Sequence, residues 1–172
     1  MRYLIYFLGI LLLLGLNLGL FPAYSVRGSA PNFLLLLVIM SALEKQDYDF
    51  YFFAFFAGLF LDFYSGLPLG SFTLGLLVLT SALYGLLQNF IIADLNWKYL
   101  AAIIAAGLLF TDAFLWIYNA IFFKLHWVAA APAFGVLLRQ LPGQLLYNWL
   151  AAFPVYLYFD RLNGLANRFV QR

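Results

Sequence analysis

The chain has 172 residues, of which 66% are hydrophobic, 21% aromatic and only 9% charged. A soluble domain is roughly 45–50% apolar and about 25% charged, so this composition is that of a membrane protein. The net charge of +2 includes no basic block, which argues against a nucleic-acid partner, and the lack of cysteine excludes disulfides and thiol nucleophiles. With a single histidine, His126, a nitrogen- or sulfur-rich metal site has almost no ligands, and we expect no cofactor.

Six apolar runs predict an all-α polytopic membrane protein that forms one integral domain over residues 1–172. The expected spans are 3–23, 31–43, 48–63, 69–90, 97–123 and 132–159, followed by a cytoplasmic tail at 160–172. The first run is too long for the apolar region of a signal peptide, so we expect it to stay attached, with cleavage as the alternative. The second and third runs are short, which favours two short helices joined by the charged turn "EKQDYD", or alternatively one hairpin dipping into the bilayer.

The distribution of basic residues predicts the orientation of these spans. If the N-terminus is cytoplasmic, six Lys and Arg residues fall inside and two, Arg27 and Lys124, fall outside. This bias favours cytoplasmic N- and C-termini, which requires an even number of spans. Six spans satisfy that requirement.

Three ionisable residues lie inside the predicted spans at comparable depth. Counting about 1.5 Å per helical residue places Asp62 and Asp112 roughly 20 Å from the cytoplasmic side, and Arg139 roughly 10 Å from the outer surface. A charge at such depth is costly and usually pairs with another inside the bundle. We therefore expect Arg139 to pair with Asp112, Asp62 or both. The alternatives are that Asp62 caps the end of its span while Arg139 extends to the interface, or that these residues form a proton or ion pathway.

Small residues and helix breakers surround Asp62 in the stretch "GLFLDFYSGLPLG". Ala54, Gly58 and Asp62 are four residues apart, so they share one helix face on which another helix, of the same chain or of a partner protein, can approach closely. Gly66, Pro68 and Gly70 then predict a turn, and the Asp62 carboxylate at its edge can accept hydrogen bonds from its free amides. The same small-residue spacing recurs at Gly15 and Gly19, and twice between Ala101 and Ala106.

The pattern Gly58-x3-Asp62-x3-Gly66-x2-Leu69-Gly70 resembles the rod shape-determining protein MreD family of bacteria. The resemblance extends in length and span order over nearly the whole chain. Its specific residues also include Pro31 before the second span and Arg139, Pro142 and Asn148 in the last. The heavy aromatic content, for example "DFYFFAFF", departs from what we expect of that family.

The resemblance implies a non-enzymatic scaffold of the cell-elongation complex, the elongasome, in the bacterial inner membrane. Such a protein would bind the single-span protein MreC and help connect MreB filaments to the peptidoglycan polymerase and transpeptidase, with membrane lipid around it. The resemblance also implies a six-helix architecture similar to the substrate-binding subunits of energy-coupling-factor transporters, although a shared fold does not carry function.

A substrate-binding membrane subunit of a vitamin-type transporter is the alternative function. The helix break after Asp62 could line a cavity that holds a small molecule, and the aromatic residues could sandwich a flat ligand. Against it, the first span offers Gly15-x3-Gly19 and not the alanine-x3-alanine motif expected of such subunits. An intramembrane enzyme is disfavoured, because the candidate acids Asp62 and Asp112 have only Arg139 at their level and no nearby histidine.

Overall fold

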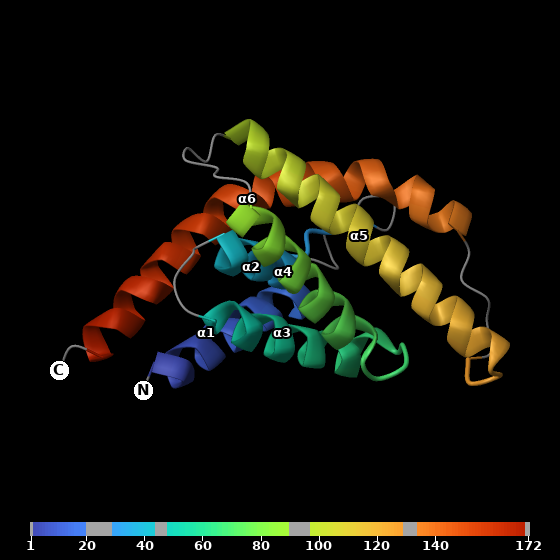
Figure 1. Cartoon of the computed structure of the whole chain (residues 1–172), viewed down its shortest axis with the longest axis horizontal. Helices are drawn as coiled ribbons and strands as arrows, with labels where there is room; N and C mark the ends of the chain where they lie inside the picture. Colours follow the sequence, from blue (N-terminus) through green and yellow to red (C-terminus); the bar gives the residue numbers. More distant parts are fainter. Residues whose placement is uncertain (1, 20–28, 44–47, 90–96, 129–133, 171–172) are drawn as a thin grey trace.

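The structure, a computed structural model, describes the chain except for residues 1, 20–28, 44–47, 90–96, 129–133 and 171–172. The described residues form six helices: α1 (Arg2–Gly19), α2 (Phe33–Leu43), α3 (Asp49–Ser65), α4 (Ser71–Asn89), α5 (Trp97–Lys124) and α6 (Phe134–Val170). Figure 1 shows them as one bundle in which the start of α1 and the last turns of α6 lie on the same side. The predicted all-α class is confirmed for the part of the chain that is described.

Helices α2 to α5 begin and end within two residues of the predicted spans, but α6 does not. It continues to Val170 through most of the segment that we expected to be a separate tail at 160–172. The reason is that this segment is amphipathic: Phe159, Leu162 and Ala166 recur on one face and are buried. A methyl group added at Gly9 would lie 2.8 Å from the Leu162 side chain, which shows how closely this part of α6 packs against α1.

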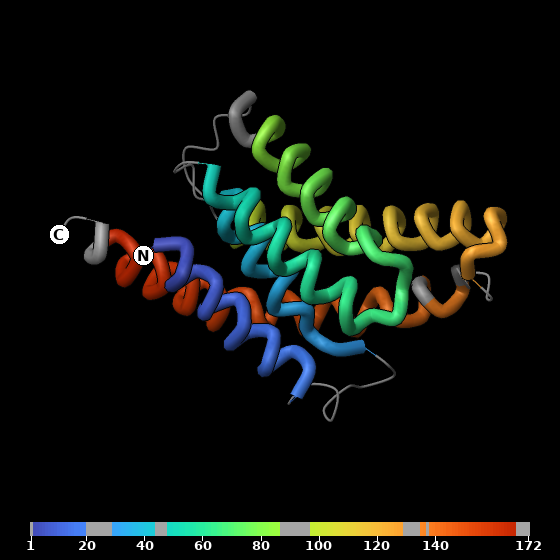
Figure 2. Tube along the Cα trace, turned by 90° about the horizontal axis from the view of Figure 1, so that it is seen from below, coloured from blue at the N-terminus to red at the C-terminus, as the bar shows by residue number. Residues whose placement is uncertain are grey.

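Helix α2 is the centre of the bundle. Every residue from Phe33 to Ala42 is buried, and α2 packs against all five other helices. A helix that is apolar on all sides is stable only when it is surrounded in this way. Figure 2 shows α1 and α5 on opposite sides of it. The hydrophobic core of the protein therefore consists of α2 and the side chains of the other five helices that pack around it.

Two of the described helices, α1 and α5, are long and apolar enough to cross a membrane by themselves. Helix α2 has 11 residues and is only about 16 Å long, against a hydrocarbon core of about 30 Å. The assignment of six spans stays a prediction.

The helices alternate in direction between two ends of the bundle. The Arg2 end is where α1 and α3 begin and α2 ends, and the Asp62 end is where α3 ends and α2 and α4 begin. Helix α6 contains Pro142 and Pro154, which each remove a backbone hydrogen bond, and Figure 1 shows it bending over the bundle. The end of α5 and the start of α6 reach beyond the turn between α3 and α4 in the same view.

Candidate functional site

Asp62 lies in the last turn of α3, with a side chain that is only 2% exposed. Its carboxylate accepts hydrogen bonds from the backbone N–H groups of Gly70 (3.0 Å), Phe72 (2.7 Å) and Thr73 (3.1 Å), and from the Thr73 hydroxyl (2.6 Å). Amides at the start of a helix have no partner within the helix, and the helix dipole favours a negative charge there. Asp62 therefore caps α4 from the neighbouring helix.

The face of α3 that carries Asp62 is covered inside the chain. Ala54 is fully buried, and a methyl group added at Gly58 would lie 2.5 Å from the Thr73 Cα atom. Real side chains essentially never come this close to backbone, so Gly58 is what permits α3 and α4 to touch. This face therefore packs against α4 of the same chain and not against another protein.

The turn after Asp62 uses both of its glycines in conformations that side chains rarely adopt. Gly66 has φ of 68° and ends α3, and Gly70 has φ of 93° immediately before α4. The N–H of Ser71 donates to the Pro68 carbonyl at 3.1 Å, which closes the turn. From α5, the Tyr118 hydroxyl donates to the Leu69 carbonyl at 3.3 Å. The turn is therefore fixed at both glycines and is also held by α5.

Asp112 and Arg139 are not brought together in the structure. Asp112 is half-buried on α5, and its Oδ2 atom is buried with no hydrogen-bond partner in the described part of the chain. Arg139 is exposed on α6, and among the described residues no ion pair joins it to Asp112 or Asp62. The reason is its position: Arg139 precedes Asn148 by nine residues, about 13 Å of helix, and Asn148 lies level with the start of α2. The predicted pairing is not formed among these residues, and Arg139 lies on the exterior of the bundle.

Three asparagines from different segments hold the buried start of α2. The side-chain oxygens of Asn148, Asn17 and Asn32 accept from the N–H groups of residues 32 (2.9 Å), 33 (3.3 Å) and 35 (3.0 Å) respectively. Asn148 is fully buried and also donates to the Gln144 carbonyl at 2.8 Å. Sequence reasoning singled out Asn148 only through the family resemblance. The backbone N–H that Asn148 accepts from belongs to Asn32, which lies 116 residues earlier, so no pattern in the sequence around Asn148 indicates this contact.

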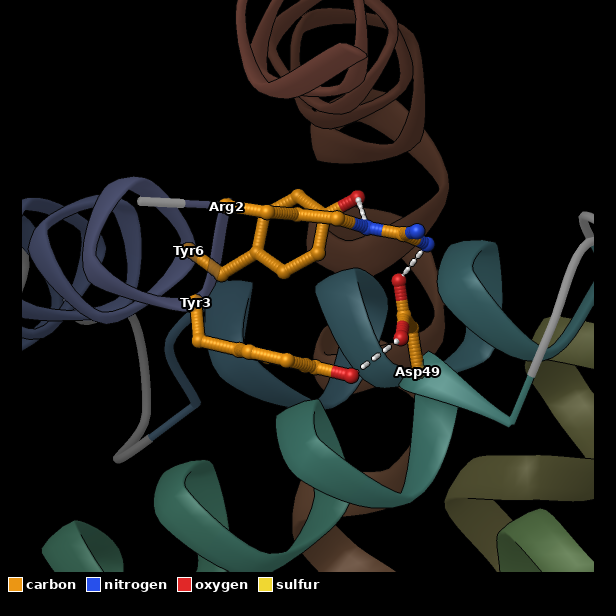
Figure 3. A network of polar contacts seen from close by, with 4 residues as sticks. All are labelled: Arg2, Tyr3, Tyr6 and Asp49. Carbon is orange, nitrogen blue, oxygen red and sulfur yellow. Dashed lines mark hydrogen bonds and ion pairs between the residues drawn. The ribbon is translucent and has the colours of Figure 1, made fainter. Parts of the chain in front are cut away.

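The Arg2 end carries a second polar network that sequence reasoning missed. Arg2 forms an ion pair with Asp49, its Nε donates to the Tyr6 hydroxyl at 3.2 Å, and the Tyr3 hydroxyl donates to Asp49 at 3.3 Å. Figure 3 shows these four side chains joining the start of α1 to the start of α3. The only sequence signal for this network is that the expected topology places Arg2 and the "EKQDYD" cluster on the same side of the membrane.

Helix α1 exposes a continuous apolar face. Leu4, Leu8, Leu12 and Gly15 are exposed and recur every three or four residues, followed by Leu18 and Gly19. A methyl group added at Gly15 or Gly19 would meet no heavy atom within 4 Å. This set of residues is called the α1 outer face below. Unlike Gly58, its glycines are not used by the described part of the chain.

The described residues contain no group of three His, Cys, Asp or Glu side chains that could hold a metal ion. The bundle has an apolar centre and an apolar exterior, and its buried polar side chains hydrogen-bond the backbone at helix ends. These features are those of a membrane bundle. The sequence of residues 1–163 matches the family model of the rod shape-determining protein MreD. The chain belongs to the MreD family, a membrane protein family that determines rod shape. No curated protein and no solved structure matches the chain.

Proposed function

We propose that this protein is a non-enzymatic scaffold of the bacterial cell-elongation complex, with six spans in the inner membrane and both termini in the cytoplasm. In this role it binds an MreC-like single-span protein and connects MreB filaments, directly or indirectly, to the peptidoglycan polymerase and transpeptidase. Family membership supports shape determination over the transporter alternative. The alternating helix directions, with the start of α1 and the last turns of α6 on the same side of the bundle, support an even number of spans.

The observation that carries the partner-binding proposal is the α1 outer face. Helices in lipid gain little from burying apolar side chains, because hydrocarbon already surrounds them, so close backbone approach at small residues is a main source of association. Gly15 and Gly19 are four residues apart, exposed and unobstructed, and leucines flank them. The corresponding small residues on α3 are buried against the same chain. We therefore assign the MreC-like helix to α1 and not to α3.

Cysteine crosslinking tests this assignment directly, because the chain has no cysteine of its own. Single cysteines at Leu8, Leu12 and Gly15 are expected to crosslink to cysteines along the transmembrane helix of the MreC-like protein. A cysteine at Ala54, which is buried, serves as the negative control, and one at Ala102, exposed on α5, tests the opposite side of the bundle. Crosslinks at Ala102 with none on α1 would move the site to α5.

A substitution pair gives an independent measurement. Gly15→Leu with Gly19→Leu is expected to lower recovery of the MreC-like protein by about tenfold, equivalent to about 1.4 kcal/mol, because the helices can no longer approach closely. Gly85→Leu on α4 is the matched control, since a methyl group there also meets no heavy atom within 4 Å. Unchanged recovery with the double variant refutes the α1 assignment. Failure to recover any MreC-like protein with the unaltered chain refutes the scaffold proposal itself.

A further inference from the structure

A cavity of about 350 Å³ opens at the Asp62 end of the bundle, where α1, α2, α4, α5 and α6 meet. Its polar wall includes Asp112 and Thr111 from α5 and Gln144 from α6, and its apolar wall includes Leu35, Phe72 and Leu108. A volume of this size lies in the range of small-molecule sites.

Two of the side chains that line the cavity each have one oxygen without a hydrogen bond. Asp112 Oδ2 and Gln144 Oε1 are both buried and have no partner among the described residues. Buried polar groups in native proteins are nearly always hydrogen-bonded, so each of these two atoms needs an explanation. Both are acceptors, and both belong to side chains that line the same cavity. A single ligand that donates hydrogen bonds accounts for the two together.

The charge of the wall narrows the chemistry of that ligand. Among the described residues that line the cavity, Asp112 is the one that is ionisable, and no ion pair joins its carboxylate to a described cation. An uncompensated charge at membrane depth is costly, which favours a cationic ligand. A metal ion is disfavoured, because the described residues contain no group of three His, Cys, Asp or Glu side chains that could hold one, and the wall supplies a single carboxylate. A primary ammonium carries one positive charge and three N–H donors, which suit a carboxylate and an amide oxygen.

We propose that this cavity binds a primary ammonium group, with Asp112 as its counter-ion and Gln144 as a second acceptor, while the apolar wall takes the attached carbon chain. The ammonium comes either from the headgroup of an ethanolamine phospholipid or from a free small amine. The proposal does not depend on the scaffold function or on the α1 outer face.

The test uses the full chain in lipid nanodiscs of three compositions. Phosphatidylglycerol forms the background, and either phosphatidylethanolamine or phosphatidylcholine is added, because both headgroups carry a positive charge, but the nitrogen bears three hydrogens in the first and three methyl groups in the second. Native mass spectrometry measures the lipid retained, and free ethanolamine is the competitor in a separate arm. Wild type is expected to retain phosphatidylethanolamine about tenfold or more over phosphatidylcholine, since a charge-assisted hydrogen bond has about this effect.

Three variants separate the cavity from general surface charge. Asp112→Asn is expected to abolish the preference, and Gln144→Leu to reduce it. Asp160→Asn, which removes an exposed carboxylate from α6, is expected to leave it unchanged. Thermal unfolding of each variant in the same nanodiscs shows that it is folded, and a rise in melting temperature with ethanolamine lipid in wild type but not in Asp112→Asn is a second expected readout.

The outcomes are distinct. Loss of lipid preference in Asp112→Asn alone supports the headgroup as the source, whereas displacement or stabilisation by ethanolamine without any lipid preference supports a free amine. Equal effects of Asp112→Asn and Asp160→Asn overturn the proposal, because the preference would then be a surface effect. The proposal is also overturned if wild type and Asp112→Asn behave alike in every arm. The same holds if Asp112→Asn loses a co-purifying protein while its lipid retention is unchanged.

Discussion

Replacing Asp62 by alanine is the most informative perturbation of this bundle. The substitution removes the acceptor of three backbone amides at the start of α4. A buried donor left without a partner costs about 1–3 kcal/mol. Leaving the part-buried amides of Gly70 and Phe72 without an acceptor is expected to cost about 1 kcal/mol each, and leaving the buried amide of Thr73 without one about 2 kcal/mol. With the lost interaction between the carboxylate and the α4 dipole, the expected destabilisation is about 4–5 kcal/mol.

Asp62→Asn separates the charge from the hydrogen bonds. The amide keeps one oxygen that can accept from Thr73 and Gly70, but its NH₂ group faces the donor of Phe72 and the negative charge is gone. The expected loss is about 2 kcal/mol, clearly smaller than that of the alanine variant.

Unfolding of the purified chain in mixed micelles, followed by the fluorescence of its four tryptophans, measures both losses. Asp160→Ala is the control, because that aspartate is exposed on α6 and should change stability by less than about 0.5 kcal/mol. The reasoning is refuted if Asp62→Ala stays within about 0.5 kcal/mol of wild type, or if the asparagine and alanine variants unfold together.

Three further predictions use the same unfolding assay. Gly58→Ala should cost about 1–3 kcal/mol, because the added methyl group would lie 2.5 Å from the backbone of Thr73, and a smaller loss would show that α3 and α4 separate easily. Gly66→Ala should cost about 1 kcal/mol through the positive φ of 68° alone, since nothing lies within 4 Å of the added atom, and Gly66→Asn should recover part of that loss. Arg2→Met should cost about 1–3 kcal/mol by leaving the Asp49 carboxylate without its cation, and adding Asp49→Leu should restore much of the stability; a double variant no better than the single one contradicts the ion pair.

The helix pattern was readable from the sequence because apolar runs and their breaks are local signals. The turn at Gly66 and Gly70 was also readable, since few residues other than glycine adopt those backbone angles. The role of Asp62 was partly readable: its proximity to free amides followed from the turn, but the sequence did not indicate whether α4 or another protein covered its face.

The structure does not bring Arg139 to either of its predicted partners. Counting residues from the expected start of the last span assumes that all helices begin at one level, whereas the start of α6 extends beyond the turn between α3 and α4. The continuation of α6 past residue 159 was missed for a related reason. Its charged residues looked like a tail, and the apolar stripe of Phe159, Leu162 and Ala166 gains its meaning only from α1 packing against it. Contacts between segments far apart in the sequence determine both the surroundings of Arg139 and the length of α6.

The position of α2 has a consequence for how the protein is made. This helix is shorter than the hydrocarbon core of a bilayer, and the acceptor for the amide that precedes it is Asn148, which is synthesised 116 residues after Asn32. During synthesis the chain must therefore hold α2 in a provisional arrangement until α6 arrives. A chain that ends before α6 therefore lacks both the Asn148 acceptor and one of the five helices that cover α2.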